Sequence, residues 1–389
     1  MRSSELKEND NKYIVNMYGR FDMAVDHASG AEVFDVEGKR YIDMTSGIGV
    51  VSLGYAEAGW VDAVTKQLGK YQHISNLYYS EPGIELAEKL VKRTGMSKVL
   101  FANSGAEANE AAFKIARKYG NVIKEGRNAI ISLKDSFHGR TIAAITATGQ
   151  DHYHKDFDPF ATGFYYAKAN DIDDLRKLSA EVLPCAVIME LVQGEGGVNA
   201  LDKEYVQYVS EFCREQDIAL IVDEVQTGIG RTGTLFAYQQ YGIEPDMVTF
   251  AKGIGNGLPI GGVICNTKFA EVLKPGDHGC TFGMNPVCCA GANYVLDTID
   301  DEFLAEVRAK GDHIRRRLDD MDGVEKTTGL GLMVGIVLRG KKPIDAAKEL
   351  LSKGVMVLTA SDKVRLLPPL IISYNEIDEA LDIMEGVFR

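Results

Sequence analysis

Short apolar runs alternate with longer amphipathic segments through the middle of the chain. Apolar runs that predict β-strands occur at Lys98–Ala102, Ala129–Leu133, Ala186–Leu191, Ile218–Val222, Met247–Phe250 and Gly262–Cys265. Between them, Glu107–Tyr119 is rich in alanine and charge, and Lys203–Gln216 has apolar residues at helical spacing. This alternation predicts an α/β fold, with a mostly parallel mixed sheet covered by helices.

The pattern changes after Pro286. The segments that follow predict a long helix (Val287–Met321), a strand pair near Gly329–Leu338, a helix (Pro343–Lys353) and short strands at Val355–Leu358 and Val364–Leu367. Near the N-terminus, Val33–Asp35 and Tyr41–Asp43 flank Glu37-Gly38 and predict a hairpin. We therefore predict a large domain at 51–286 and a smaller α+β domain at 287–389, which packs with the N-terminal segment 1–50.

Composition and charge exclude several classes of function. The chain has 389 residues, 45% of them hydrophobic and 25% charged, and a formal net charge of −13, which would repel a nucleic-acid backbone. No apolar stretch approaches membrane-spanning length and the first dozen residues are polar, so we expect a cytoplasmic protein with no membrane partner. The six cysteines lack CxxC spacing, which predicts reduced thiols and no structural metal.

Two ionisable residues stand at the ends of predicted strands. Lys252 follows the run Met247–Ala251 and opens a glycine-rich stretch, and Asp223 follows Ile218–Val222. Open α/β sheets bind ligands at the carboxyl ends of their strands. A lysine and an acid placed there suggest a site for pyridoxal 5'-phosphate (PLP), with Lys252 as the Schiff-base residue and Asp223 at the pyridine nitrogen. Each residue alone would more often be a solvated lysine or a turn-forming acid.

The segment Asn103-Ser104-Gly105-Ala106 lies between a predicted strand and an alanine-rich helix. Glycine permits close backbone approach, serine can donate a hydrogen bond, and a helix N-terminus favours an anion, so Ser104, Gly105 and Ala106 are candidates to bind the phosphate. Taken alone, the segment is more often a serine N-cap with small-residue packing.

A second motif favours a different function. Residues 228–233 (GIGRTG) match the dinucleotide fingerprint GxGxxG, which would indicate a NAD-dependent oxidoreductase. The context is poor, because Asp223–Gln226 separate the preceding strand from the glycines and no convincing helix follows. The oxidoreductase is therefore a distant alternative, and a catalytically silent PLP-binding protein is another.

Eight motifs between about residues 30 and 372 resemble, in order, those of the class III aminotransferases of fold type I. They are SNLYYSEP (75–82), NSGAEANEAAFKIAR (103–117), FHGRT (137–141), QGEGGV (193–198), DEVQTGIGRTG (223–233), AKGIGNGLPIGG (251–262), HGCTFGMNP (278–286) and RLLPPLI (365–371). Within this family the motifs are most similar to those of the enzymes that act on acetylornithine.

The resemblance implies roles at the cofactor. It matches Lys252 to the Schiff-base lysine, Asp223 to the partner of the pyridinium, Gln226 to a neighbour of the ring hydroxyl and Phe137 to the aromatic residue that stacks on the ring. It matches Gly105 and Ala106 to the phosphate-binding amides. Thr281 is similar to the threonine that reaches the phosphate from the neighbouring subunit, which implies a homodimer with shared active sites.

The resemblance also implies roles toward the substrates. Arg140 resembles the arginine that binds the distal carboxylate, Arg365 resembles the one that binds the α-carboxylate of glutamate, and Glu195 resembles the removable counter-ion of Arg365. Cys280 stands where the family commonly has serine or threonine. Because Cys280, Met284 and Leu366-Leu367 depart from the family pattern at the border of the substrate pocket, the acyl group of the donor stays open.

The activity implied is ping-pong transamination from the ω-amino group of N2-acetyl-L-ornithine to 2-oxoglutarate. The products would be N-acetylglutamate 5-semialdehyde and L-glutamate, as in arginine biosynthesis. Ornithine, succinylornithine and 4-aminobutyrate are the alternative amino donors.

Overall fold

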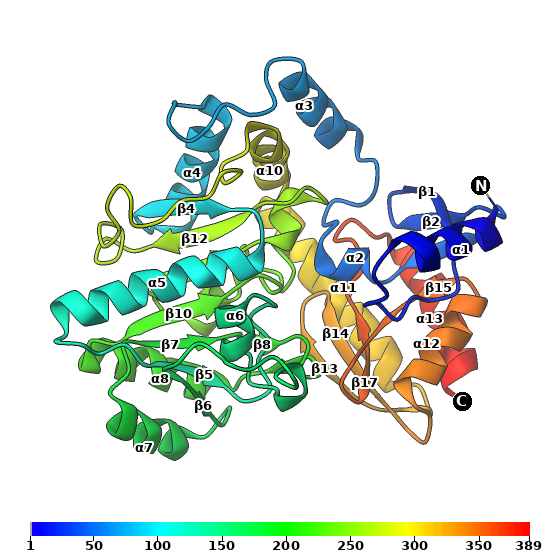
Figure 1. Ribbon diagram of the computed structural model, residues 1–389. Helices are drawn as coiled ribbons and strands as arrows, with labels where there is room; N and C mark the ends of the chain where they lie inside the picture. The colour runs from blue at the N-terminus through cyan, green and yellow to red at the C-terminus, as the bar shows by residue number, and fades with distance from the viewer. Residues whose placement is uncertain (1) are drawn as a thin grey trace.

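A seven-stranded sheet forms the centre of the computed structural model, which describes residues 2–389 (Figure 1). Its strand order is β4-β12-β11-β10-β7-β5-β6. The strands are β4 (Lys98–Ala102), β5 (Ile130–Leu133), β6 (Phe164–Ala167), β7 (Ala186–Met189), β10 (Ala219–Asp223), β11 (Met247–Phe250) and β12 (Gly261–Cys265). Since only β12 runs antiparallel to its neighbours in this sheet, the predicted mostly parallel mixed sheet is confirmed.

Helices cover both faces of this sheet. In β7, Ala186 and Ile188 pack with helix α5 (Gly105–Ile123), whereas Val187 and Met189 pack with the cluster that contains helix α8 (Lys203–Gln216). Successive side chains of a strand point to opposite faces, so a strand buried on both faces is apolar throughout. This explains why the interior strands are continuous apolar runs in the sequence.

Most predicted element bounds agree with the structure to within a few residues, with two corrections. Strand β6 was not predicted; it lies at the sheet edge, where Phe164 and Ala167 are buried but the two tyrosines between them are exposed or half-buried. The long helix predicted over Val287–Met321 is wrong. It is two helices, α10 (Pro286–Thr298) and α11 (Asp301–Asp319), because Asp300 leaves the helical conformation and its side chain accepts a hydrogen bond from Phe303 N at 2.8 Å.

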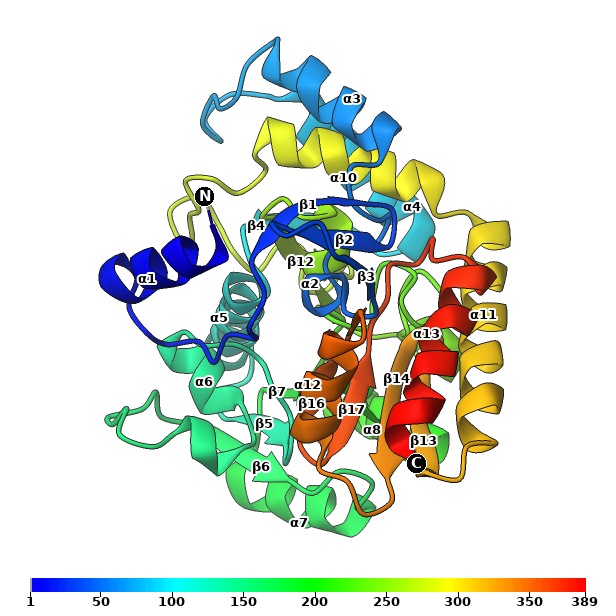
Figure 2. The ribbon, with the colours of Figure 1, turned by 90° about the vertical axis from the view of Figure 1, so that its right-hand side faces the viewer.

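The remaining part of the molecule is built from segments near both ends of the chain (Figure 2). The N-terminal strands β1 (Val25–Ser29), β2 (Glu32–Asp35) and β3 (Arg40–Asp43) form a sheet with β15 (Val355–Met356), which pairs in parallel with β3. The predicted hairpin is thus confirmed. The other four-stranded sheet has the order β13-β14-β17-β16, from Val324–Leu330, Met333–Leu338, Lys363–Leu366 and Leu358–Ala360. The domain boundaries at 50 and 286 stay a prediction.

The other elements complete the two parts. Near the top of Figure 1, α3 (Ala58–Leu68) and α4 (Glu81–Thr94) pack against α10. The remaining helices are α1 (Ser3–Tyr13), α2 (Ser46–Gly49), α6 (Ile142–Ala147), α7 (Ile172–Val182), α9 (Tyr238–Tyr241), α12 (Pro343–Ser352) and α13 (Tyr374–Phe388). Within residues 2–389, no helix combines the length and the apolar character needed to cross a membrane.

Candidate active site

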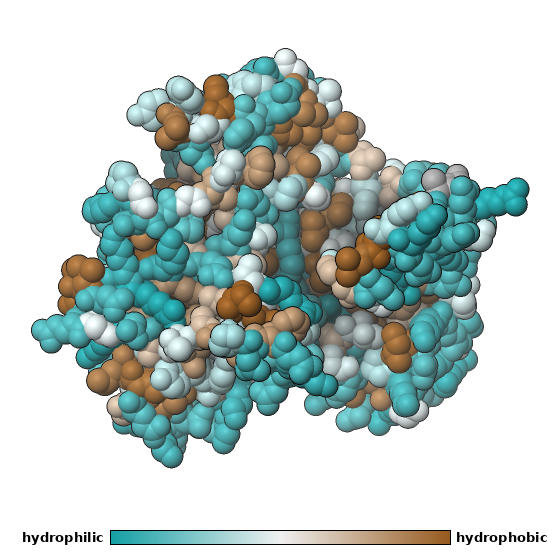
Figure 3. Space-filling view, in the orientation of Figure 1, coloured by the Kyte–Doolittle hydropathy of each residue, from teal (hydrophilic) through white to brown (hydrophobic). Residues whose placement is uncertain are grey.

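Loops that follow several strands of the large sheet meet in one cavity of about 380 Å³. It lies at the carboxyl edge of the sheet, where the space-filling view shows a recess between the two parts of the molecule (Figure 3). The cavity brings together Ser104, Gly105, Ala106, Phe137, Arg140, Asp223, Gln226 and Lys252. These candidates are up to 148 positions apart in the chain, from 104 to 252, and sheet order unites them.

Lys252 enters the cavity from the loop after β11. Its backbone has a φ of 47°, an uncommon left-handed conformation for a residue with a side chain, and the next glycine has no room for a Cβ, which would lie 2.6 Å from Ser52 Oγ. Burial lowers the pKa of the Lys252 amine, and the Arg365 charge acts in the same direction, against Glu195 and Asp223, which raise it. A lowered pKa increases the fraction of neutral amine that can act as nucleophile and base.

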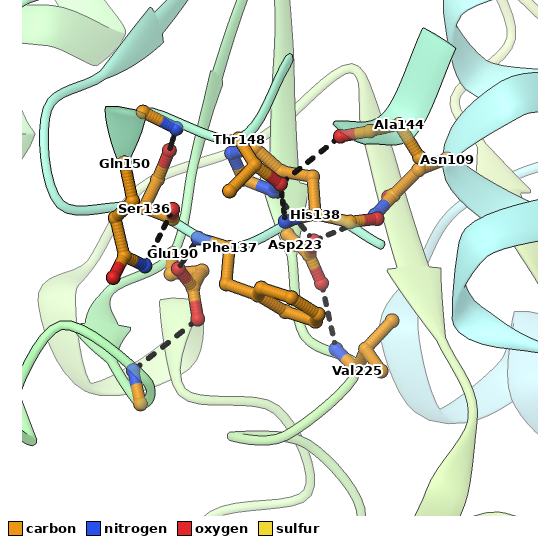
Figure 4. A network of polar contacts seen from close by, with 12 residues as sticks. Asn109, Ser136, Phe137, His138, Ala144, Thr148, Gln150, Glu190, Asp223 and Val225 are labelled. Atoms are coloured by element: carbon orange, nitrogen blue, oxygen red, sulfur yellow. Dashed lines mark hydrogen bonds and ion pairs between the residues drawn. The ribbon is translucent and has the colours of Figure 1, made fainter. Parts of the chain in front are cut away.

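The Asp223 carboxylate is held by three donors (Figure 4). Its Oδ2 accepts hydrogen bonds from Asn109 Nδ2 and His138 Nδ1, each at 2.8 Å, and its Oδ1 accepts one from Val225 N at 3.0 Å. Because a carboxylate only accepts, His138 carries its proton on Nδ1. Asn109 and His138 were not predicted, although they lie in the motifs at 103–117 and 137–141, because nothing in the local sequence indicates that they point at Asp223.

Glu190 ties two loops of the site together. Its Oε1 accepts a hydrogen bond from Phe137 N at 2.8 Å and its Oε2 accepts one from Gly194 N at 3.3 Å. Burial raises the pKa of Glu190 to about 7, against the nearby His138, which lowers it. Figure 4 shows the Phe137 ring between Glu190 and Val225. Glu190 therefore fixes the backbone that presents this ring, and it too was missed from the sequence.

The start of α5 forms one end of the cavity. Ser104 is the N-cap, since its Oγ accepts a hydrogen bond from Glu107 N at 3.2 Å, and the ordinary interpretation of this serine is thus present. A Cβ at Gly105 would lie 2.6 Å from a Val225 methyl, so only glycine fits there. The first amides of a helix have no intrahelical acceptor, and together with the helix dipole they favour an anion at Gly105 and Ala106.

Glu195 and Arg365 form an ion pair next to this cavity. Glu195 Oε1 lies 2.6 Å from an Arg365 guanidinium nitrogen, and the same nitrogen is 3.4 Å from Gln226 Oε1. Burial is the largest single effect and opposes ionisation of Glu195, but the charge and hydrogen bond of Arg365, together with Lys252 and Gln226, lower the pKa of the carboxyl below its usual value. Arg365 Nε is buried and has no hydrogen-bond partner among residues 2–389. A substrate carboxylate could satisfy this donor once Glu195 has moved.

Arg140 lies at the mouth of the cavity with an exposed side chain. Its guanidinium carbon is 4.1 Å from the ring centroid of Tyr153 and 5.4 Å from that of Phe137. Aromatic faces attract a guanidinium and leave its edge donors available, so this stacking presents Arg140 to an incoming carboxylate. Tyr153 is a further residue that sequence reasoning missed.

Two further candidates, Cys280 and Thr281, also lie outside the lining of the cavity. Cys280 Sγ accepts a hydrogen bond from Asn103 Nδ2 at 3.1 Å, and Thr281 is exposed on the following loop. The expected contact of Thr281 with a phosphate in a neighbouring subunit therefore stays a prediction.

The glycines at 228–233 do not form a dinucleotide site. Between these glycines and β11 the only α-helix is the four-residue α9, which begins several residues after the last glycine. Arg231 is buried and donates hydrogen bonds to the carbonyl oxygens of Leu332 and Pro368, at 3.1 and 2.5 Å. This loop thus joins the large sheet to the C-terminal part.

Taken together, the cavity holds the amine of Lys252 after β11, the carboxylate of Asp223 at the end of β10, a helix N-terminus and an aromatic ring. This set fits a flat cofactor that has an electrophilic carbon, a basic ring nitrogen and a phosphate, as the sequence predicted.

Comparison with known proteins gives the family. The chain belongs to the aminotransferase class-III family, which matches residues 13–388. It is 49% identical to the acetylornithine aminotransferase of Haemophilus ducreyi, over 100% of this chain and 99% of the relative. It is 44% identical to that of Caldanaerobacter subterraneus, over 97% and 98%.

Solved structures agree with this assignment. An ornithine aminotransferase from Toxoplasma gondii, whose structure shows partial occupancy of PLP at the active site, has a TM-score of 0.94 at 29% identity, over 100% of this chain and 94% of that one. The N-acetylornithine aminotransferase of Stenotrophomonas maltophilia has a TM-score of 0.83 at 33% identity, over 98% and 97%. The resemblance and the fold predicted from the sequence are confirmed.

Proposed function

We propose that the protein uses PLP to transfer the ω-amino group of N2-acetyl-L-ornithine to 2-oxoglutarate, a step of arginine biosynthesis. The observation that carries the proposal is the Glu195–Arg365 ion pair beside Lys252, at 2.6 Å. A pocket that must accept both an ω-amine and glutamate needs an arginine whose charge can be covered and uncovered. The full-length relatives named as acetylornithine aminotransferases support the choice of donor.

The chemistry divides between the cofactor and the chain. PLP, when bound, supplies an aldehyde that combines with amino groups and a ring that withdraws electrons from the substrate carbon. Lys252 would bind the cofactor covalently and move the proton at the substrate carbon, for which its lowered pKa suits it. Asp223, oriented by Asn109 and His138, would keep the ring nitrogen protonated.

Other residues of the cavity would hold the cofactor in place. Phe137 would stack on the flat ring and Gln226 would lie by its hydroxyl, while the amides of Gly105 and Ala106 with the Ser104 hydroxyl would bind the phosphate. Gln226 and Asp223 are buried, so this side of the cofactor ring would be shielded from water.

The two substrates use the arginines differently. Arg140 would bind the carboxylate far from the reacting carbon, in acetylornithine as in 2-oxoglutarate and glutamate. An ω-amine stands on a methylene with no carboxylate beside it, so Glu195 stays paired with Arg365 for that donor. Glutamate brings an α-carboxylate, and Glu195 then releases Arg365 to bind it.

A panel of amino donors tests the proposal. With 2-oxoglutarate as acceptor and glutamate formation as readout, we expect kcat/KM for N2-acetylornithine to exceed that for ornithine, N2-succinylornithine and 4-aminobutyrate. Discrimination of about tenfold or more would correspond to roughly 1.4 kcal/mol of transition-state binding. A clear preference for one of the other donors would replace acetylornithine while leaving the family chemistry intact.

Replacing Glu195 with alanine is expected to favour glutamate over acetylornithine. Arg365 would then carry a permanently available charge, which helps the substrate that has an α-carboxylate and hinders the one that does not. We expect the ratio of the glutamate to the acetylornithine half-reaction rates to rise about tenfold or more, for about 1.4 kcal/mol of lost discrimination. Single-turnover kinetics measure each half-reaction, with Glu211→Ala, at an exposed surface pair, as control. Equal ratios in wild type and variant would rule out the switch.

We also infer that the enzyme is a homodimer whose subunits complete each other's sites. Large side chains are exposed near the loop of Thr281, with Leu77 at 87%, Tyr79 at 97% and Phe282 at 60% exposure. Exposed apolar surface of this kind marks protein interfaces. Light scattering is expected to give twice the chain mass of 42.6 kDa.

A further inference from the structure

Strands β8 (Val192–Gln193) and β9 (Asn199–Ala200) form a short antiparallel hairpin with Glu195 in its loop. We call residues 192–200 the switch hairpin. Strand β17 contacts it through two side chains, those of Arg365 and Lys363. We propose that Lys363 is a positioning residue that fixes the backbone around Glu195, so that only the Glu195 side chain moves when Arg365 is released. The inference rests on the proposed exchange of substrates at Arg365.

The contact of Lys363 reaches the residue next to Glu195 through Asn199. Lys363 Nζ donates hydrogen bonds to Asn199 Oδ1 at 2.7 Å and to Thr328 Oγ1 at 3.2 Å. Asn199 Nδ2 in turn donates to the carbonyl oxygen of Gly196 at 2.9 Å. Because residues i and i+2 of a strand share a face, Lys363 and Arg365 hold the switch hairpin side by side, Lys363 through the Asn199 side chain and Arg365 through the Glu195 carboxylate.

The other side of Glu195 is held as well. Gly194 N donates to Glu190 Oε2 at 3.3 Å, and a Cβ at Gly194 would lie 2.4 Å from Gln226 Oε1. A Cβ at Gly196 would lie 2.3 Å from the Asp135 carbonyl oxygen. The backbone is therefore packed closely before and after Glu195. The Glu195 side chain is still 23% exposed, toward the neighbouring cavity of about 600 Å³ that it lines.

Stability does not explain a lysine at position 363. The side chain is only 6% exposed, and its two hydrogen-bond partners are uncharged. Burial lowers the pKa of Lys363, against Asp362, which raises it. A buried ammonium is costly to desolvate, and an apolar residue of similar length would fill the same space without that penalty. A role in holding the switch hairpin accounts for the lysine.

A double-mutant cycle tests the inference with the full-length holoenzyme. The variants are Lys363→Met, Glu195→Ala and the double variant, each measured in separate single-turnover half-reactions with glutamate and with acetylornithine. A loosened hairpin holds Glu195 less firmly against Arg365. We therefore expect Lys363→Met to raise the glutamate to acetylornithine rate ratio about fivefold, and to add nothing in the Glu195→Ala background.

Two further variants separate positioning from general damage. Lys310→Met is the matched control, because Lys310 is 7% exposed and donates to Leu370 O at 3.3 Å, away from the switch hairpin; its ratio is expected to equal that of wild type. Lys363→Arg keeps a donor and is expected to return the ratio to within about twofold of wild type. It also serves as the informative variant if Lys363→Met does not fold, and a shift as large as that of Glu195→Ala would then overturn the inference.

The outcomes distinguish the two levels of the argument. If Glu195→Ala shifts the ratio and Lys363→Met does not, or if the two shifts add fully, the role of Lys363 is wrong and the proposed function stands. If Glu195→Ala leaves the ratio unchanged, the exchange at Arg365 is wrong and the role of Lys363 is overturned with it.

Discussion

Replacing Lys252 with alanine is expected to lower kcat by about four orders of magnitude, because the variant loses both its covalent link to the cofactor and its proton carrier. Lys252 is the lysine that lines the cavity, and its lowered pKa suits both roles. A coupled assay for glutamate measures the rate. Hydride reduction of the PLP-loaded protein followed by peptide mass analysis provides a second readout, in which the wild-type peptide containing residue 252 carries the pyridoxyl mass and the variant peptide does not.

Controls for this variant address folding and chemistry separately. Lys310→Ala removes another buried lysine outside the cavity and is expected to keep the rate within about threefold, since it alters no group near the substrate. A small primary amine added to Lys252→Ala is expected to restore part of the rate by carrying the proton. A pyridoxyl group on another lysine, or turnover close to wild type, would show that Lys252 is not the reactive amine.

Replacing Asp223 with asparagine is expected to lower kcat by about a thousandfold, or roughly 4 kcal/mol of transition-state stabilisation. The change removes a fixed negative charge from a buried position and leaves the shape of the side chain almost the same. A neutral amide does not keep a ring nitrogen protonated, so electrons leave the substrate carbon less readily. The single-turnover rate constants of both half-reactions are expected to fall, because both depend on the same ring.

The matched control lies at the opposite edge of the same sheet. Asp246 precedes β11 and accepts hydrogen bonds from Leu220 N at 2.9 Å and from Asn266 Nδ2 at 2.7 Å. Asp246→Asn makes the same chemical change far from the cavity and is expected to affect the melting temperature more than kcat. Comparable losses of kcat in the two variants would mean that Asp223 acts through stability, not through the ring nitrogen.

Much of the fold could be predicted because the sheet is buried on both faces. Strand β11 appears in the sequence as the apolar run Met247–Phe250, with the bounds that the structure has. The prediction failed where burial is incomplete or a turn is short. Strand β6 lies at the sheet edge and buries only its first and last side chains, and the break between α10 and α11 depends on the cap at Asp300.

Local pattern was sufficient to place Lys252 and Asp223, because a polar residue at the end of a strand lies at the carboxyl edge of a parallel sheet, and both residues line the cavity there. The partners of such groups depend on which distant segments the sheet order brings together. His138 and Asp223 are 85 positions apart, Lys363 and Asn199 are 164 apart, and Arg365 and Glu195 are 170 apart. No local propensity encodes such pairings, so only the folded chain shows that a buried lysine supports the loop of Glu195.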